Sequence, residues 1–130
     1  MQYLASRKII HRDLAPRNIL INDTSGDHRG DIKIADFGLS KKLDKKQYYY
    51  TKLIQGSDSE AELPWRHLAP ELLQEDKMVF SESTDVWSYG ITLWEMFSLA
   101  KLHPYSEFST FTGNFINAVK YGNYRNPMPE

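Results

Sequence analysis

Hydrophobic positions in the first third of the chain predict short strands. Ile9 and Ile10 form one β-branched run, and residues 19–21 form a second. Residues 31–35 alternate polar and apolar side chains with a period of two, which indicates a strand. Turn-forming residues fill positions 22–30, so we expect residues 19–21 and 31–35 to pair as a β-hairpin.

Longer elements are predicted on either side of this small sheet. Residues 1–8 indicate the last turns of a helix. Residues 39–63 show no sustained period of either kind, so we expect an irregular segment there. A long helix is predicted up to about Ser98, with Ser83 and Thr84 as capping residues. Its apolar side chains occur nearly all round the helix, which is typical of a helix buried inside a domain.

Two shorter helices complete the pattern. Pro70 stands near a plausible helix start and is followed by the apolar pair Leu72 and Leu73. A final helix is expected from about residue 111 to residue 121, because Gly122 and two prolines follow. The order is a helix end, a small sheet, a long loop and then helices, which indicates the α+β class.

The composition excludes several classes of protein. The 130 residues carry 16 Lys and Arg against 17 Asp and Glu, a net charge of -1, and 41% of the residues are hydrophobic. We therefore expect a soluble globular domain, since no apolar run approaches the ~18 residues of a membrane span. The chain has no cysteine, which excludes disulfides and thiolate metal sites. A near-neutral charge argues against nucleic-acid binding.

Three short segments carry the candidate chemistry. In chain order they are His11-Arg12-Asp13-Leu14-Ala15-Pro16-Arg17-Asn18, Asp36-Phe37-Gly38 and Ala69-Pro70-Glu71. They fit the catalytic-loop pattern H-R-D-x-x-x-x-N, the D-F-G metal-binding turn and the A-P-E motif. With all three in order, the chain resembles the C-terminal lobe of protein kinases over essentially its whole length. The resemblance implies a protein-kinase-like fold, mostly helical with a small β-hairpin region.

The resemblance also implies roles for single residues. Asp13 is expected to act as the catalytic base, and Asn18 and Asp36 to bind Mg²⁺ beside the phosphates of ATP. Taken alone, Asp13 could instead cap a surface turn, and Asp36 could belong to a hairpin exit with Gly38 at positive φ. Five further residues are expected to be structural: His11, Phe37, Gly38, Glu71 and Asp85. In the kinases that the chain resembles, the counterpart of Glu71 pairs with a later arginine, and the counterpart of Asp85 holds the backbone of the catalytic loop.

Arg17 bears on the substrate class. Kinases that act on Ser or Thr usually carry Lys two residues after the catalytic Asp, where this chain has Ala15. Arg17, four residues after Asp13, is the arrangement of receptor-type tyrosine kinases, whose loop usually reads H-R-D-L-A-A-R-N. Pro16 replaces the usual alanine and stiffens the loop. The resemblance therefore implies transfer of the γ-phosphate of ATP to protein tyrosine.

The segment before Ala69 looks like the shelf on which tyrosine kinases bind their substrate. Pro64, Trp65 and Arg66 are its expected residues. Families usually place Trp where His67 lies and an aliphatic residue where Trp65 lies, so this chain departs from the pattern at both positions.

Tyr48, Tyr49 and Tyr50 resemble the autophosphorylation sites of tyrosine-kinase activation loops. Arg12, a cation next to the catalytic Asp13, is the expected partner of a phosphotyrosine there. Nearby lysines would add attraction for phosphate: Lys41, Lys42, Lys45, Lys46 and Lys52. The alternative is that the tyrosine–lysine run is a solvated loop without a regulatory role.

The resemblance implies that residues 1–130 are a partial kinase domain. They are expected to run from the end of the helix before the catalytic loop through the helix at about 111–121, without the N-lobe and the final helices. No glycine-rich G-x-G-x-x-G loop and no V-A-I-K-type lysine occurs in the sequence. We therefore expect little activity from these residues alone.

Two other functions stay open at this point. One is a non-catalytic kinase-fold interaction module or truncated product, and the other is a Ser/Thr or dual-specificity kinase. The expected partners are ATP and tyrosine-bearing proteins in signal transduction, with an activating kinase or dimer, and no nucleic acid. The expected location is cytoplasmic, or the cytoplasmic side of a membrane receptor if the parent chain has a transmembrane segment.

Overall fold

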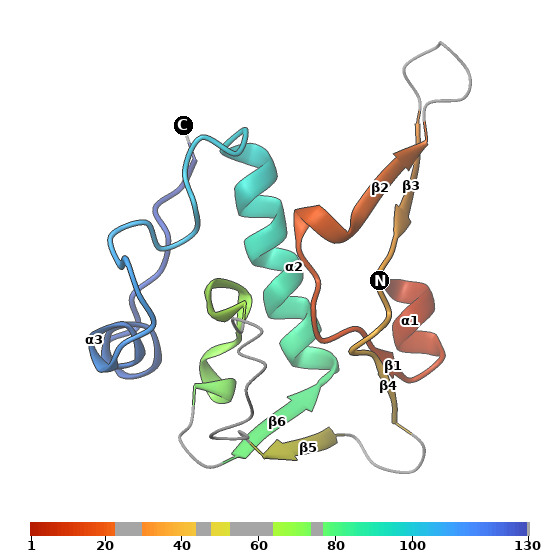
Figure 1. Ribbon diagram of the computed structural model, residues 1–130, viewed down its shortest axis with the longest axis horizontal. Coiled ribbons are helices and arrows are strands. Elements are labelled where there is room, and N and C mark those ends of the chain that lie inside the picture. Colours follow the sequence, from red (N-terminus) through yellow and green to blue (C-terminus); the bar gives the residue numbers. More distant parts are fainter. Residues whose placement is uncertain (23–29, 44–47, 53–63, 74–76, 130) are drawn as a thin grey trace.

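The fold is built around one long helix, α2, with short strands and helical turns packed beside it (Figure 1). The computed structural model describes residues 1–22, 30–43, 48–52, 64–73 and 77–129. The elements in chain order are α1 (Gln2–Ser6), β1 (Ile9–Ile10), η1 (Pro16–Asn18), β2 (Ile19–Asn22), β3 (Asp31–Ile34), β4 (Lys41–Lys42), β5 (Tyr48–Lys52), η2 (Trp65–His67), η3 (Pro70–Leu72), β6 (Lys77–Ser81), α2 (Glu82–Phe97), α3 (Gly113–Ile116) and η4 (Asn117–Tyr121). Among these described elements, no helix is long and apolar enough to cross a membrane.

The strands form three two-stranded antiparallel sheets. β2 pairs with β3 from Ile19 opposite Ile34 to Asn22 opposite Asp31, which confirms the predicted hairpin. The prediction of an irregular segment over residues 39–63 was wrong in part, because β4 pairs with β1 and β5 pairs with β6. Each of these strands finds its partner more than 24 residues away, and β4 has only two residues, so no local periodicity reveals them.

Helix α2 begins earlier than its sequence suggested. Ser81, with an extended backbone, is the N-cap, and Ser81 and Thr84 form a capping box in which the Thr84 hydroxyl accepts the Ser81 N–H at 3.2 Å. Ser83 and Thr84 are therefore helical residues, and of the two predicted caps only Thr84 takes part in capping, from the third helical position. One face of α2 is buried, and it carries mostly small polar groups: Thr84, Asp85, Ser88, Ile91 and Thr92.

The apolar residues of α2 are not buried all round, as the pattern had led us to expect. Val86 is 68% exposed and Phe97 71% exposed, with Tyr89 and Met96 also exposed. The buried face of the helix instead packs on the loop of residues 11–15 and on η2, where its polar side chains hydrogen-bond backbone groups.

The hydrophobic core lies between α2, the segment carrying η2 and η3, β6 and the C-terminal segment. It includes Leu68, Ala69, Leu72, Leu73, Met78, Phe80, Ile91, Tyr105, Phe115 and Val119. Phe115 packs edge-on against Trp65, Tyr105 and Phe108, with ring centroids 4.7 to 5.4 Å apart. These aromatic contacts join the segment before Ala69 to the C-terminal part of the chain.

The two shorter predicted helices are present in reduced form. The helix expected at residues 69–73 is the single 3₁₀ turn η3. The helix expected at residues 111–121 begins at Gly113, changes from α3 to the π-helical turn η4, and ends at Tyr121 with Gly122 as its C-cap, as predicted.

Candidate active site

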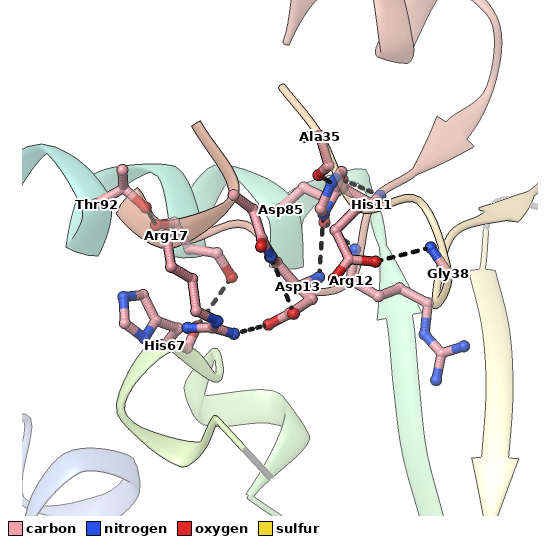
Figure 2. Close-up of polar contacts among 12 residues, drawn as sticks. His11, Arg12, Asp13, Arg17, Ala35, Gly38, His67, Asp85 and Thr92 are labelled. Atoms are coloured by element: carbon pink, nitrogen blue, oxygen red, sulfur yellow. Dashed lines mark hydrogen bonds and ion pairs between the residues drawn. The ribbon is translucent and has the colours of Figure 1, made fainter. Parts of the chain in front are cut away.

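The loop of residues 11–15 is fixed to the first turn of α2 by a buried carboxylate (Figure 2). Asp85 Oδ2 accepts the backbone N–H of His11 at 2.6 Å, and Asp85 Oδ1 accepts the backbone N–H of Arg12 at 3.0 Å. Asp85 is only 4% exposed. Arg12 has φ of 73°, a left-handed conformation that is unfavourable for a residue with a Cβ. The two hydrogen bonds to Asp85 stabilise this conformation.

His11 connects the same loop to the exit of β3. Its side chain is fully buried, and its Nδ1 accepts the backbone N–H of Asp13 at 3.3 Å. Its Nε2 lies 2.9 Å from the carbonyl oxygen of Ala35. Because Nδ1 accepts, the tautomer with the proton on Nε2 satisfies both contacts. Phe37 packs edge-on against the imidazole at 5.0 Å, so His11 ties the loop to the Asp36-Phe37-Gly38 turn.

The Asp13 carboxylate is held by two side chains that follow it in the chain. Arg17 Nη2 donates to Asp13 Oδ1, and Asn18 Nδ2 donates to Asp13 Oδ2 at 3.0 Å and to the Asp13 carbonyl oxygen at 2.7 Å. The 3₁₀ turn η1, with Pro16 at its first position, brings Arg17 and Asn18 back toward Asp13. The Asp13 side chain is 15% exposed and that of Arg17 52% exposed. The carboxylate is therefore fixed in orientation and open to solvent on one side.

Asn18 and Asp36 lie just outside the two strands of the β2–β3 hairpin, at its open end. The N–H of Ala35 donates to the carbonyl oxygen of Asn18 at 2.8 Å and so extends the strand pairing to the residue before Asp36. Asp36 itself, and not Gly38, has positive φ, at 59°, and Gly38 N–H donates to its Oδ1 at 3.3 Å. The Asp36 side chain is exposed, in keeping with a role outside the core.

The chemistry of these two side chains fits Mg²⁺. The amide nitrogen of Asn18 is already used by Asp13, which leaves its oxygen for a cation, and Asp36 adds a carboxylate. Hard oxygen ligands suit Mg²⁺, which keeps several waters and takes further ligands from nucleotide phosphates. In the part of the chain that the structure describes, no cluster of three His, Asp or Glu side chains forms a self-sufficient metal site. A Mg²⁺ ion that is shared with a nucleotide usually has only one or two carboxylate ligands from the protein, together with waters and substrate phosphates.

Arg12 points away from Asp13, toward β6. Its Nη1 donates to the carbonyl oxygen of Leu39 at 3.1 Å, and its guanidinium lies 4.2 Å from the centre of the Phe80 ring. Phe80 is the register partner of Tyr49 in the β5–β6 sheet. The backbone of the predicted regulatory tyrosines therefore runs next to β6, the strand that Arg12 contacts. Two of the lysines expected to attract phosphate, Lys45 and Lys46, lie outside the described residues.

The segment of residues 64–67, which contains the expected substrate shelf, is anchored to the C-terminal part of the chain through Arg66. Arg66 donates to the carbonyl oxygens of Pro104 at 2.6 Å and of Tyr105 and Phe108 at 2.8 Å each. Its guanidinium also stacks on the Trp65 ring at 4.1 Å. Burial lowers the pKa of the Arg66 guanidinium from its ordinary value.

The sequence analysis missed Glu95, which pairs with His67. His67 Nε2 lies 2.6 Å from Glu95 Oε1, and the Ser88 hydroxyl donates to the His67 carbonyl oxygen at 2.9 Å. A signal was present in the sequence, since Glu95 is the one acidic residue between positions 86 and 97. Glu71, by contrast, is exposed and lines a separate cavity of about 550 Å³ with Trp87 and Arg125.

Comparisons with known proteins agree with these motifs. The whole chain, residues 1–130, matches the sequence profile of the family described as protein tyrosine and serine/threonine kinase. It is 44% identical over 130 residues to fibroblast growth factor receptor 1 of Dugesia japonica and 43% identical to the receptor-like tyrosine-protein kinase kin-15 of Caenorhabditis elegans. It is also 40% identical over 125 residues to the tyrosine-protein kinase hopscotch of Drosophila melanogaster.

These alignments cover 100%, 100% and 94% of this chain. They cover only 13%, 24% and 10% of the respective relatives, so the chain spans a small part of each. The family profile nevertheless matches every motif segment described above, in one continuous stretch. The chain belongs to the protein tyrosine and serine/threonine kinase family.

Proposed function

We propose that the protein is a protein tyrosine kinase, which transfers the γ-phosphate of ATP to tyrosine hydroxyl groups of other proteins. The observation that carries this proposal is the position of Asp13, whose carboxylate is oriented by Arg17 on one oxygen and by Asn18 on the other. A general base must present a fixed oxygen to the hydroxyl that it deprotonates. Asp13 does so on the solvent-open side of its loop.

Each residue of the site has a step in the proposed reaction. The Asp13 carboxylate accepts the proton of the tyrosine hydroxyl as the phenol oxygen bonds to the γ-phosphorus, and the bond to the bridging oxygen breaks to release ADP. The Arg17 cation holds Asp13 and adds positive charge beside the reacting oxygen. When bound, Mg²⁺ would neutralise charge on the phosphate oxygens, with Asn18 and Asp36 as its protein ligands.

The choice of tyrosine over serine rests on the loop sequence. Arg17 is the cation that contacts Asp13, and Ala15 occupies the position at which Ser/Thr kinases usually carry Lys. The similarity to a fibroblast growth factor receptor and to two tyrosine-protein kinases supports the same choice.

Phosphorylation of Tyr48, Tyr49 and Tyr50 is the proposed means of regulation. These residues form β5, whose partner strand β6 leads directly into α2 and carries the ring on which Arg12 stacks. A phosphate on β5 would add a charge of about −1.5 to −2 to the strand that pairs with β6, whose Phe80 ring this cation contacts. Replacing Tyr48 and Tyr49 together by Phe should suppress activation of the intact kinase, as measured by the time course of autophosphorylation, and unchanged activation would rule out the switch.

The 130 residues contain only some of the sequence motifs of a protein kinase domain. The 130 residues contain no glycine-rich loop and no V-A-I-K-type lysine, so we expect these residues alone to bind ATP weakly and to transfer little phosphate. We propose that the natural chain acts in the cytoplasm or on the cytoplasmic side of a membrane. Its proposed substrates are tyrosine-bearing proteins, and a second kinase molecule is proposed to activate it.

The test is the effect of Asp13→Asn and Arg17→Lys in the natural full-length chain. Asp13→Asn keeps the shape but removes the base, so kcat should fall by about 10²-fold or more. Arg17→Lys keeps the charge but loses the fork geometry and should give a smaller loss. Asp31→Asn, at the far end of the hairpin, is the matched control. An unchanged kcat for Asp13→Asn would show that Asp13 is not the base, whereas no phosphate transfer by the natural full-length chain would favour a non-catalytic interaction module.

A further inference from the structure

We propose that Ser40 is a positioning residue for Asp36, because the Ser40 hydroxyl closes the turn that begins directly after this carboxylate. The inference rests on the proposed function, in which Asp36 is a ligand of the Mg²⁺ that accompanies ATP. Ser40 follows Asp36 by four residues and belongs to none of the three motif segments.

Few groups hold the Asp36 carboxylate directly. Its side chain is exposed, and among the described residues only the N–H of Gly38 donates to it, at 3.3 Å. Its φ of 59° is a left-handed conformation that is unfavourable for a residue with a Cβ. A metal ligand has to be held in orientation by the groups around it. The orientation of Asp36 therefore depends on the backbone that follows it.

The carbonyl oxygen of Phe37 accepts two hydrogen bonds from Ser40. The Ser40 backbone N–H donates at 3.0 Å, and the Ser40 hydroxyl donates at 2.7 Å, so both lone pairs of the oxygen have a partner. The first bond is the usual closing bond of a β-turn over residues 37–40. The second bond depends on the hydroxyl, which Ser and Thr can supply from this position. The hydroxyl therefore fastens the residue next to Asp36.

Both ends of this turn are attached to the catalytic loop. At its start, the Phe37 ring packs edge-on against the buried imidazole of His11. Near its end, Arg12 Nη1 donates to the carbonyl oxygen of Leu39 at 3.1 Å, and the strand β4 that follows pairs with β1. The Ser40 hydroxyl joins these two ends. Its removal should loosen the turn while both attachments, and with them the stability of the whole protein, are kept.

The experiment compares Ser40→Ala, which removes the hydroxyl, with Ser40→Thr, which keeps it, in the natural full-length chain. Affinity for fluorescent ATP is measured with and without Mg²⁺. Because one hydrogen bond contributes about three- to tenfold to an equilibrium constant, the magnesium-dependent gain in affinity should be smaller by this factor in Ser40→Ala. The affinity without Mg²⁺ and the melting temperature should not change, and Ser40→Thr should restore the gain. Ser6→Ala is the matched control, since the Ser6 hydroxyl also donates to the carbonyl oxygen three residues before it, that of Tyr3, at 2.8 Å.

Hydrogen exchange in the absence of any ligand separates this inference from the proposed function. The backbone N–H groups of Gly38 and Ser40 lie in the turn, and they should exchange about three- to tenfold faster in Ser40→Ala than in the natural chain or in Ser40→Thr. A natural chain without a magnesium-dependent gain would contradict the proposed magnesium site, while equal exchange rates would overturn the role of Ser40. Where the natural chain shows the gain, an unchanged gain in Ser40→Ala, or an equal loss in Ser40→Ala and Ser40→Thr, would also overturn the inference.

Discussion

The carboxylate of Asp85 accepts the backbone N–H of His11 at 2.6 Å, across 74 residues of sequence. Its second oxygen accepts the N–H of Arg12, the residue before the candidate base. The first turn of α2 thereby fixes the backbone from which the Asp13 side chain projects. The position of the candidate base depends on a residue that itself lies outside the reacting groups.

We expect Asp85→Asn to destabilise the protein and to lower its activity. The amide keeps one accepting oxygen, but its NH₂ group faces the second backbone N–H, so a buried donor loses its partner at a cost of about 1–3 kcal/mol. Thermal unfolding of the purified protein measures this loss. The matched control is Glu82→Gln in the same helical turn, whose exposed ion pair with Lys8 contributes little. Equal melting temperatures for the two variants would contradict the role given to Asp85.

Asp36→Asn should weaken magnesium-dependent nucleotide binding without unfolding the protein. Asp36 is exposed, and its one described hydrogen bond, from Gly38 N–H, can be kept by the asparagine oxygen. Loss of the negative charge removes a ligand that Mg²⁺ prefers. A titration of the full-length chain with fluorescent ATP, with and without Mg²⁺, should show the magnesium-dependent gain in affinity for Asp31→Asn but not for Asp36→Asn. The same gain in both variants would show that Asp36 is not a ligand.

Arg66→Met should lower the free energy of unfolding clearly and change the kinetic constants little. The guanidinium donates to three carbonyl oxygens of residues 104–108, and hydrogen bonds to charged groups contribute roughly 1.5–3 kcal/mol each, so the total loss should reach about 3 kcal/mol or more. Chemical denaturation measures the loss, with Lys101→Met as an exposed control. If Arg66→Met instead raised KM for peptide at unchanged stability, Arg66 would be the substrate contact that its sequence position suggested.

Tyr105→Phe should leave stability unchanged or raise it, by about 1 kcal/mol at most. Its hydroxyl is buried, and none of the described residues hydrogen-bonds to it. Burial also raises the pKa of Tyr105, an effect that Arg125 opposes and Tyr124 adds to. The folded state therefore favours the protonated phenol, so this contribution to stability is full below the unfolded pKa of about 10 and is lost as pH rises toward the folded value.

Urea unfolding at pH 8 and above pH 10 checks the sign of this effect. The natural chain should lose more stability over this range than Tyr105→Phe does. Tyr3→Phe, at a position that is 67% exposed, should behave like the natural chain. An identical pH dependence for all three proteins would contradict the assignment to Tyr105.

Local patterns and motifs predicted the β2–β3 hairpin, the end of the last helix at Gly122 and the segments that meet around Asp13. The strands β4 and β5 escaped prediction because their partners, at residues 9–10 and 77–81, are distant in the chain. The buried face of α2 was not predicted, because it consists mostly of the polar residues Thr84, Asp85, Ser88 and Thr92. Their side chains hydrogen-bond backbone groups, and a hydrophobic pattern does not show such contacts.

Within the site, spacing alone could not reveal which side chains touch. Pro64, Trp65 and Arg66 are expected to form a substrate shelf, and the sequence does not show that Arg66 is also bound to the segment of residues 104–108. The contact between His67 and Glu95 joins residues 28 positions apart, and the sequence marks Glu95 only as the one acidic residue between positions 86 and 97 without indicating its partner. Such contacts follow from the packing of η2 on α2, which only the folded chain shows.

The most direct test of the central claim is the phosphate acceptor itself. Two peptides that are identical except for a single Tyr or Ser are incubated with ATP, Mg²⁺ and the natural full-length chain, and the phosphorylated residue is identified by mass spectrometry. The arrangement of Asp13, Arg17 and Asn18 predicts phosphate on the tyrosine peptide and none above background on the serine peptide. Phosphate on serine alone, or on neither peptide after activation of the full chain, would contradict it.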